Sequence, residues 1–221
     1  MSYIGKGIPR VESFEKVTGI AKYVNDLMLP GMLYAKMLLS PHAHAKIKRI
    51  DVSRAKELPG VKAVLTGEEL NYKQGLYLRD KDILAKGKVR YQGEPVAAVA
   101  AVSEEIAEQA ISLIEVEYEL LPTVFDPVEA IKEDAPLVHE ELGSYEFMKG
   151  VFHPVPGTNI ANHHKLRKGD VEKGFKESYK IIENEFRMPQ VAHVPMETHV
   201  VIAEWLPNDR IKVYTSAQSP F

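Results

Sequence analysis

The sequence predicts a fold that mixes strands and helices, and one passage carries most of that prediction. Residues 96–102 are apolar at every position, as in a strand that is buried on both faces. Ser103 and the two glutamates after it indicate a helix start, because a serine side chain caps free N–H groups and acidic groups favour the positive helix end. Apolar residues then recur at helical spacing. Residues 115–120 alternate between glutamate and apolar side chains, which is typical of a half-exposed strand.

The segments before this passage are predicted to be mostly strands. Turn residues separate short apolar runs there, and a helix over 53–58 is expected to end at a Pro-Gly pair. Residues 71–88 are charged and irregular, so we expect a loop. The predicted strands lie at 21–24, 32–39, 47–52 and 61–65.

The C-terminal third is expected to be less regular. A stretch dense in proline, glycine and acidic residues follows position 125 and predicts a connector. Asp170 is a candidate cap for a short helix over 171–178. The predicted strands in this part lie at 181–188, 199–205 and 210–216.

Composition excludes several classes of function. A net charge of −3 gives the chain no attraction to nucleic acid or anionic lipid. The longest apolar run, 96–102, is far shorter than the roughly 20 residues of a membrane-spanning helix. The first residues lack the apolar core of a secretory signal, so a cytoplasmic location is expected. Cysteine is absent, which excludes disulfides, thiolate nucleophiles and iron–sulfur ligation by this chain.

Histidines offer a metal hypothesis with a plainer alternative. His42 and His44 are two residues apart, so on a strand both would face one side. His163 and His164 are adjacent and would diverge. No H-E-x-x-H pattern is present, and a structural or surface role is the favoured interpretation. We predict no metal ligand.

Two other groups of residues suggest chemistry without completing a site. His193, Glu197 and His199 form a potential acid–base cluster, since a carboxylate can tune a nearby imidazole, although Glu197 can equally satisfy a turn. Ser40 lies near histidines but lacks the G-x-S-x-G elbow of a hydrolase. No G-x-G-x-x-G or phosphate loop occurs. The chemistry alone indicates a mixed α and β protein without a self-contained active site.

The last predicted strand leads directly into a neutral amide. Gln218 follows residues 210–217, and a Pro-Phe pair comes after it, ending in Phe221. A strand that ends in a glutamine and a turn can direct one amide at a bound ligand.

Short motifs follow one another along most of the chain. The first are GIPR at 7–10, EKVTGIAKY at 15–23, LPGMLYA at 29–35, SPHAHA at 40–45, YQGEPVA at 91–97 and VEYELLP at 116–122. The later ones are GDV at 169–171, HVPME at 193–197, AEW at 203–205 and QSPF at 218–221. In this order the motifs resemble the molybdenum-binding subunit of the xanthine dehydrogenase, aldehyde oxidase and carbon monoxide dehydrogenase family.

This resemblance implies an α+β protein: an α/β hammerhead domain followed by the first strands of an incomplete molybdopterin-binding domain. The implied division is an extended lead-in at 1–18, the hammerhead at 19–125, a connector at 126–149 and the cofactor-domain fragment at 150–221. We expect the hammerhead to be stable alone. Residues 150–221 are expected to pack poorly or to oligomerise without a partner.

The resemblance further implies part of a molybdenum hydroxylase that oxidises an aldehyde or an N-heterocycle. Such enzymes use a molybdopterin-type cofactor, and their electrons leave through iron–sulfur and FAD-binding partners. Full subunits of the family are much longer than 221 residues, so the chain alone is expected to be inactive and to bind no cofactor by itself. A non-catalytic assembly or interaction module of a redox complex is the alternative.

Two residues are carried over from the family as cofactor contacts. Gln218 matches a glutamine whose amide hydrogen-bonds an oxygen ligand of the molybdenum, a task that suits a neutral donor. Phe221 matches the following turn and is expected to wall the cofactor or substrate pocket, or simply to pack. No catalytic residue is assigned, because the glutamate base of the family corresponds to no residue here. The resemblance leaves open the substrate, and whether the chain is a natural split subunit.

Overall fold

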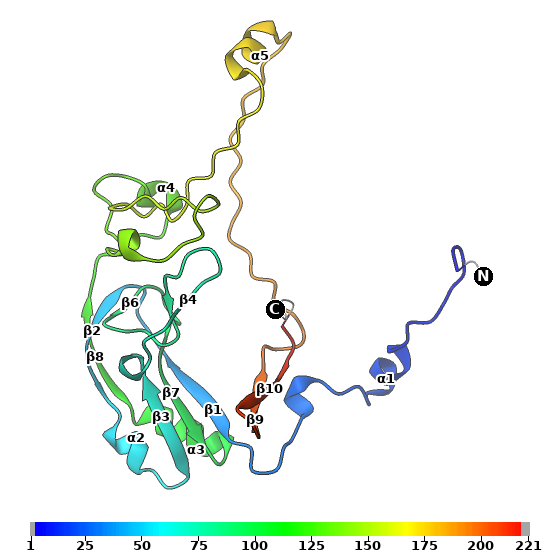
Figure 1. Cartoon of the computed structure of the whole chain (residues 1–221), viewed down its shortest axis with the longest axis vertical. Helices are drawn as coiled ribbons and strands as arrows, with labels where there is room; N and C mark the ends of the chain where they lie inside the picture. The colour runs from blue at the N-terminus through cyan, green and yellow to red at the C-terminus, as the bar shows by residue number, and fades with distance from the viewer. Residues whose placement is uncertain (1–2, 218–221) are drawn as a thin grey trace. The chain divides into compact units, whose positions relative to one another are not determined.

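A computed structural model describes residues 3–217 of the chain (Figure 1). The chain divides into two compact units, one comprising residues 31–176 and the other combining 1–30 with 177–221. Each unit is described by itself below. Among the described residues, no helix has the length and apolar character needed to cross a membrane.

The unit of residues 31–176 contains two three-stranded antiparallel sheets, in the orders β1–β7–β3 and β6–β2–β8, and a small ribbon, β4–β5. Its strands are β1 (Tyr34–Leu39), β2 (Ala45–Asp51), β3 (Val61–Thr66), β4 (Lys73–Gln74), β5 (Lys81–Asp82), β6 (Lys88–Val89), β7 (Pro95–Ala101) and β8 (Glu115–Leu120). Its helices are α2 (Ser53–Glu57), η2 (Gly67–Glu69), α3 (Glu104–Ser112), α4 (Pro127–Ala130) and η3 (Leu142–Ser144), while α5 (Val171–Glu177) spans the boundary between the units.

The passage β7–α3–β8 confirms the strongest prediction from the sequence. The Ser103 side chain accepts a hydrogen bond from the Ile106 amide, as a helix cap does. Helix α3 lies along β1 and β7 (Figure 1). Gly60 makes the turn before β3 with φ +97°, and a Cβ there would lie 2.7 Å from Cδ1 of Ile106. Only glycine therefore allows this turn to approach α3 so closely.

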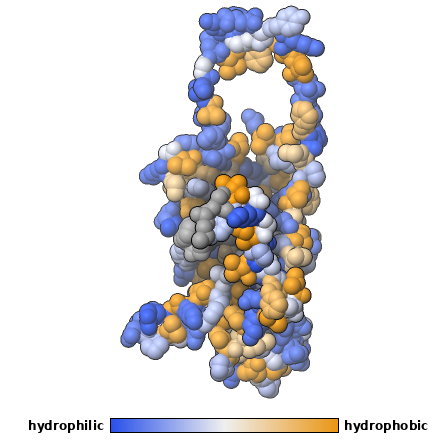
Figure 2. Space-filling view, turned by 90° about the vertical axis from the view of Figure 1, so that its right-hand side faces the viewer, coloured by the Kyte–Doolittle hydropathy of each residue, from blue (hydrophilic) through white to orange (hydrophobic). Residues whose placement is uncertain are grey.

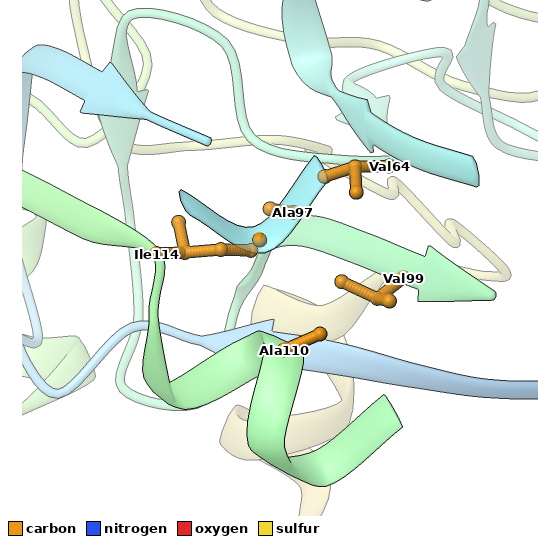
Figure 3. Close-up of a cluster of buried hydrophobic side chains, with 6 residues drawn as sticks. Val64, Ala97, Val99, Ala110 and Ile114 are labelled. Carbon is orange, nitrogen blue, oxygen red and sulfur yellow. The ribbon is translucent and has the colours of Figure 1, made fainter. Parts of the chain in front are cut away.

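The main hydrophobic core lies between the β1–β7–β3 sheet and the helices α2 and α3. Val99 on the central strand is 1% exposed and faces the same side as Val64 on β3. Figure 3 shows these side chains with Ala97, Ala110 and Ile114. A second cluster joins Ala45, Ala85, Val89 and Val96. Burial at both sites explains why β7 is apolar throughout.

Residues 71–88 differ in part from the predicted loop. Three short strands, β4, β5 and β6, begin or lie within this range, and Leu84 and Ala85 are buried. Strand β6 pairs with β2, and the Ala85 amide donates to the Pro95 carbonyl. The pairing of β6 with β2 joins residues more than 40 apart in the sequence, so local patterning does not reveal it.

The stretch expected as a connector is ordered and packs against the same unit. Asp126 caps α4 by accepting hydrogen bonds from two backbone amides. Leu142 and Tyr145 are buried in a third cluster with Leu78, and the ring of Phe152 stacks on Tyr77. Two backbone hydrogen bonds between residues 77–79 and 146–148 fix this contact. The proposed domain boundaries stay a prediction.

The other unit contains α1 (Ser13–Thr18), η1 (Val24–Asp26) and a hairpin of β9 (Val201–Leu206) and β10 (Arg210–Thr215). The hairpin and α5 confirm the predictions for 199–205, 210–216 and 171–178. Asp170 caps α5 as expected, with its carboxylate accepting from the Lys173 amide.

Two predicted strands are wrong. Residues 21–24 lead into a turn, because the Asp26 carboxylate accepts a hydrogen bond from the Tyr23 amide and bends the chain there. Residues 181–188 form no strand, since no neighbouring strand pairs with them in the described part of the chain. A strand needs a paired neighbour as well as an apolar pattern.

Candidate functional site

The two predicted cofactor contacts, Gln218 and Phe221, lie outside the described residues. Strand β10 ends at Thr215, three residues before the glutamine, and the Ala217 amide donates to the Thr215 hydroxyl. The role assigned to the amide of Gln218 therefore stays a prediction, as does the pocket role of Phe221.

The strand that leads to Gln218 belongs to a regular antiparallel hairpin. Ile211 lies opposite Trp205, and Val213 lies opposite Ala203, so these four side chains share one face. The other face carries a hydrogen bond from the Tyr214 hydroxyl to Glu204 at 3.2 Å. This second face also carries Ile202 and Leu206, so both faces of the hairpin have apolar side chains.

None of the described residues 161–217 is buried, and each of them is exposed or half-exposed. Hydrophobic side chains accordingly stand at the surface among charged ones (Figure 2). A cofactor site is a concave pocket that covers most of its ligand. The described residues of this region do not enclose one.

The candidate metal-binding histidines have structural roles in the described chain. The buried His44 ring donates from Nδ1 to the Pro122 carbonyl at 2.6 Å, and its Nε2 is buried without a protein partner. The His42 ring packs edge-on against Tyr118. Within residues 3–217 no group of three metal-ligating side chains comes together.

The potential acid–base cluster does not assemble either. His193 and His199 are exposed, and within the described chain no hydrogen bond or ion pair joins either of them to Glu197. Val194 between them has φ +43°, a left-handed conformation that β-branched residues rarely adopt. The described chain therefore has a distinct turn at this point, and no acid–base pair forms there.

A polar cluster that the sequence did not reveal surrounds Arg90, whose side chain is 9% exposed. Its guanidinium lies 3.9 Å from both Asp82 and Glu141, and its Nε is buried without a protein partner. These residues line a cavity of about 630 Å³ together with Lys73 and Tyr145. The cations along the cavity each have a carboxylate within 4 Å, so its wall presents little unpaired charge.

Burial perturbs the titration of two groups in this cluster. Burial, reinforced by the charge of Arg90, lowers the pKa of His139 to about 4, so the ring is neutral at physiological pH. Burial and a hydrogen bond to Glu141 raise the pKa of Tyr145 to about 12. The His139 ring and the Tyr145 hydroxyl lie 3.0 Å apart. The cluster fastens residues 139–146 to the unit and shows no catalytic pairing.

Two protein-family models together match most of the chain. Residues 18–122 match the family model described as "Aldehyde oxidase and xanthine dehydrogenase, a/b hammerhead domain". Residues 152–221 match the model described as "Molybdopterin cofactor-binding domain". The two matches follow one another along the chain in the order that the motifs predicted.

Individual proteins show the same likeness. The chain is 38% identical over 191 residues to a probable xanthine dehydrogenase subunit of Bacillus subtilis, covering 85% of this chain and 23% of that protein. It is 31% identical over 219 residues to the "Nicotinate dehydrogenase large molybdopterin subunit" of Eubacterium barkeri, covering 98% and 48%. The crystal structure of the Cu,Mo carbon monoxide dehydrogenase superposes with a TM-score of 0.82 at 34% identity, covering 98% of this chain and 28% of that one.

Proposed function

Because the chain belongs to the aldehyde oxidase and xanthine dehydrogenase family, we propose that it forms part of a molybdenum hydroxylase. The proposed reaction is oxidation of an aldehyde or an N-heterocycle. The observation that carries this proposal is the likeness to a molybdenum-containing carbon monoxide dehydrogenase over 98% of the chain.

The chain spans about a quarter of the length of the Bacillus relative and about half of the Eubacterium one. The remainder of those proteins has no counterpart in these 221 residues. We therefore assign the chain the hammerhead and the beginning of the cofactor-binding domain, and we expect turnover only when the rest of the subunit is present.

The residues present fit a molybdopterin-type cofactor only in part. Chemistry favours Gln218, because an amide donates a hydrogen bond without adding charge or competing as a metal ligand. For Phe221 we propose a place in the wall of the cofactor or substrate pocket, with simple packing as the alternative. The described residues before them provide strands and no enclosure. When bound, the cofactor would supply the redox chemistry at molybdenum, while this chain would orient it from one side.

The proposal includes redox partners and a location. Several relatives are named as subunits, and electrons from substrate oxidation need an acceptor. Iron–sulfur and FAD-binding subunits are the partners proposed here, since this chain has no cysteine with which to ligate a cluster. We propose a cytoplasmic location for this assembly.

Isolation of the native assembly tests the proposal. The tagged chain is purified from the organism that makes it, and bound molybdenum and pterin are measured, followed by dye-linked oxidation of aldehydes and N-heterocycles. Stoichiometric molybdenum and turnover are expected. A Gln218→Ala variant should lose at least about tenfold in turnover, as when one preorganised hydrogen-bond donor is removed. The matched control Gln74→Ala changes an exposed glutamine in the other unit and should retain activity.

The alternative, a non-catalytic assembly module, has one observation in its favour: the buried core of the described chain lies in the unit of residues 31–176. It predicts a complex with redox proteins that contains no molybdenum. It also predicts that Gln218→Ala has no effect on any activity of that complex. Either result would refute the hydroxylase proposal in favour of the assembly module.

A further inference from the structure

The side chain of Arg90 is buried with few hydrogen-bond partners. It is 9% exposed, and within the described chain its guanidinium donates to the Lys88 carbonyl from Nη1 at 3.3 Å. Its Nε is buried without a partner. A guanidinium carries several N–H donors, and leaving buried donors unmet is unfavourable. Arg90 also lines the cavity of about 630 Å³, so an acceptor bound in that cavity can meet these donors.

Two carboxylates flank this guanidinium without a direct hydrogen bond to it. Nη1 lies 3.9 Å from Asp82 and Nη2 lies 3.9 Å from Glu141, whereas a hydrogen bond needs about 3.2 Å or less. Asp82 is already bound to the Lys73 ammonium at 2.8 Å. The Tyr145 hydroxyl lies near the guanidinium and donates its own hydrogen bond to Glu141 at 3.0 Å. The charge of Arg90 is thus compensated, while most of its N–H donors lack an acceptor.

The gap between Arg90 and Glu141 determines which groups can fill it. It has a donor on one side and an acceptor on the other, 3.9 Å apart. A neutral group with adjacent carbonyl oxygen and N–H, as in a cyclic amide, can accept from the guanidinium and donate to the carboxylate at the same time. An additional anion is disfavoured, because Asp82 and Glu141 would repel it. A bridging water is the smallest group that meets both requirements.

The cavity has room for a ring beside this gap. Its volume lies within the range of small-molecule sites, which combine apolar and aromatic walls with a few polar groups. Leu70 and the Tyr72 ring, which is 58% exposed, supply apolar surface. Asn71 and Ser144 add polar groups to the wall. All the lining residues belong to the unit of residues 31–176, which has its own buried core.

We propose that the cavity beside Arg90 binds a small neutral cyclic amide. The carbonyl oxygen of the ligand accepts a hydrogen bond from the Arg90 guanidinium, and its N–H donates to the Glu141 carboxylate. The ring lies in the cavity against Leu70 and Tyr72. The site is independent of the proposed function, since its lining residues all precede the match to the cofactor-binding domain at 152–221.

Titration of the purified chain with 2-pyridone, a planar cyclic amide, tests this site. Calorimetry gives the affinity, and the backbone amide resonances of the chain show where the ligand binds. We expect saturable binding with a dissociation constant of about 1 mM or tighter, which is reasonable for so small a ligand. The resonances that shift should belong to residues 70–73, 79–90 and 141–146. The absence of saturable binding, as when water alone fills the gap, overturns the proposal, and so do shifts confined to other residues.

Two other ligands separate a cyclic amide from other occupants and require no variant of the protein. N-methyl-2-pyridone keeps the carbonyl oxygen but has no N–H, so it should bind at least about tenfold more weakly, as when a hydrogen bond to a charged group is lost. Benzoate carries a negative charge and should also bind at least about tenfold more weakly than 2-pyridone, because of the flanking carboxylates. Equal affinity for the two pyridones, or tighter binding of benzoate, would refute the assignment.

Two glutamate variants test the contact to the carboxylate. Glu141→Ala removes the acceptor and should weaken 2-pyridone binding by about tenfold or more. The matched control Glu146→Ala lines the same cavity but pairs with Arg79, and it should change the affinity by about twofold or less. Both side chains are more than half exposed, so both variants are expected to fold. Equal effects of the two variants would contradict the assigned role of Glu141.

The same titration of the tagged native assembly shows whether the cavity stays open there. Binding of 2-pyridone to the assembly with an affinity within about threefold of that of the free chain supports a small-molecule site. Loss of binding on assembly would mean that polypeptide fills the cavity, and it would overturn the proposal. Neither result depends on the presence of molybdenum, so the outcome is separate from that of the hydroxylase proposal.

Discussion

Truncation of Val99 tests whether the core between the β1–β7–β3 sheet and α3 stabilises the unit of residues 31–176. Val99 is 1% exposed on the central strand. Val99→Ala removes two buried methyl groups, worth about 1.6 kcal/mol at ~0.8 kcal/mol for each buried carbon. A residual cavity of roughly 40 Å³ adds about 1 kcal/mol. The expected loss in the free energy of unfolding is therefore about 2.5 kcal/mol.

Urea unfolding of the whole chain followed by far-ultraviolet circular dichroism measures this loss. Tryptophan fluorescence is unsuitable, because the single tryptophan lies in the other unit. With a slope of about 2 kcal/mol per molar urea, the midpoint should fall by roughly 1 M.

Met37 provides the matched control because it lies on β1, next to β7, and is 57% exposed. Met37→Ala removes more atoms than Val99→Ala but should cost less than about 0.5 kcal/mol, since its side chain remains largely in water. Equal losses in the two variants would refute the division of this sheet into a buried and an open face.

Three further predictions use other features of the chain. Gly75→Ala should lower the melting temperature much more than Gly87→Ala, because both have positive φ but only at residue 75 would a Cβ meet backbone, at 1.8 Å from a carbonyl oxygen. Burial lowers the pKa of His139 from 6.5 to about 4. Because the His139 ring therefore takes up its proton at a higher pH in the unfolded chain than in the folded one, the free energy of unfolding should fall as the pH drops from 6.5 towards 4. A His139→Asn variant should show a smaller loss of urea midpoint over that range. Limited proteolysis should cut residues 161–217 before the packed unit, and survival of that segment alone would contradict the burial pattern.

The sequence predicted correctly those parts of the fold in which the capping residue, the apolar pattern and the spacing all indicate the same element. The cap at Ser103, the apolar run before it and the helical spacing after it all indicate the same strand and helix, and the structure has both. The cap at Asp170 is equally local and equally correct. Such agreement between propensity, pattern and capping is what specifies an element without knowledge of its neighbours.

Elements that depend on distant partners could not be predicted in this way. Strand β6 exists because Lys88 and Val89 pair with β2, more than 40 residues earlier in the chain. The cluster around Arg90 likewise gathers Asp82 and Glu141 from separate segments. Conversely, residues 181–188 have a strand-like composition but lack a pairing strand among the described residues. The site itself was predicted only through family motifs, and its two residues lie outside the described part.

The two units of the chain differ in how much apolar surface they bury. Val99 and its neighbours give the unit of residues 31–176 a core of its own, whereas the β9–β10 hairpin exposes Trp205 and Ile211 on one face. A hairpin with that face in water gains little from burial, so its conformation depends on what packs against it.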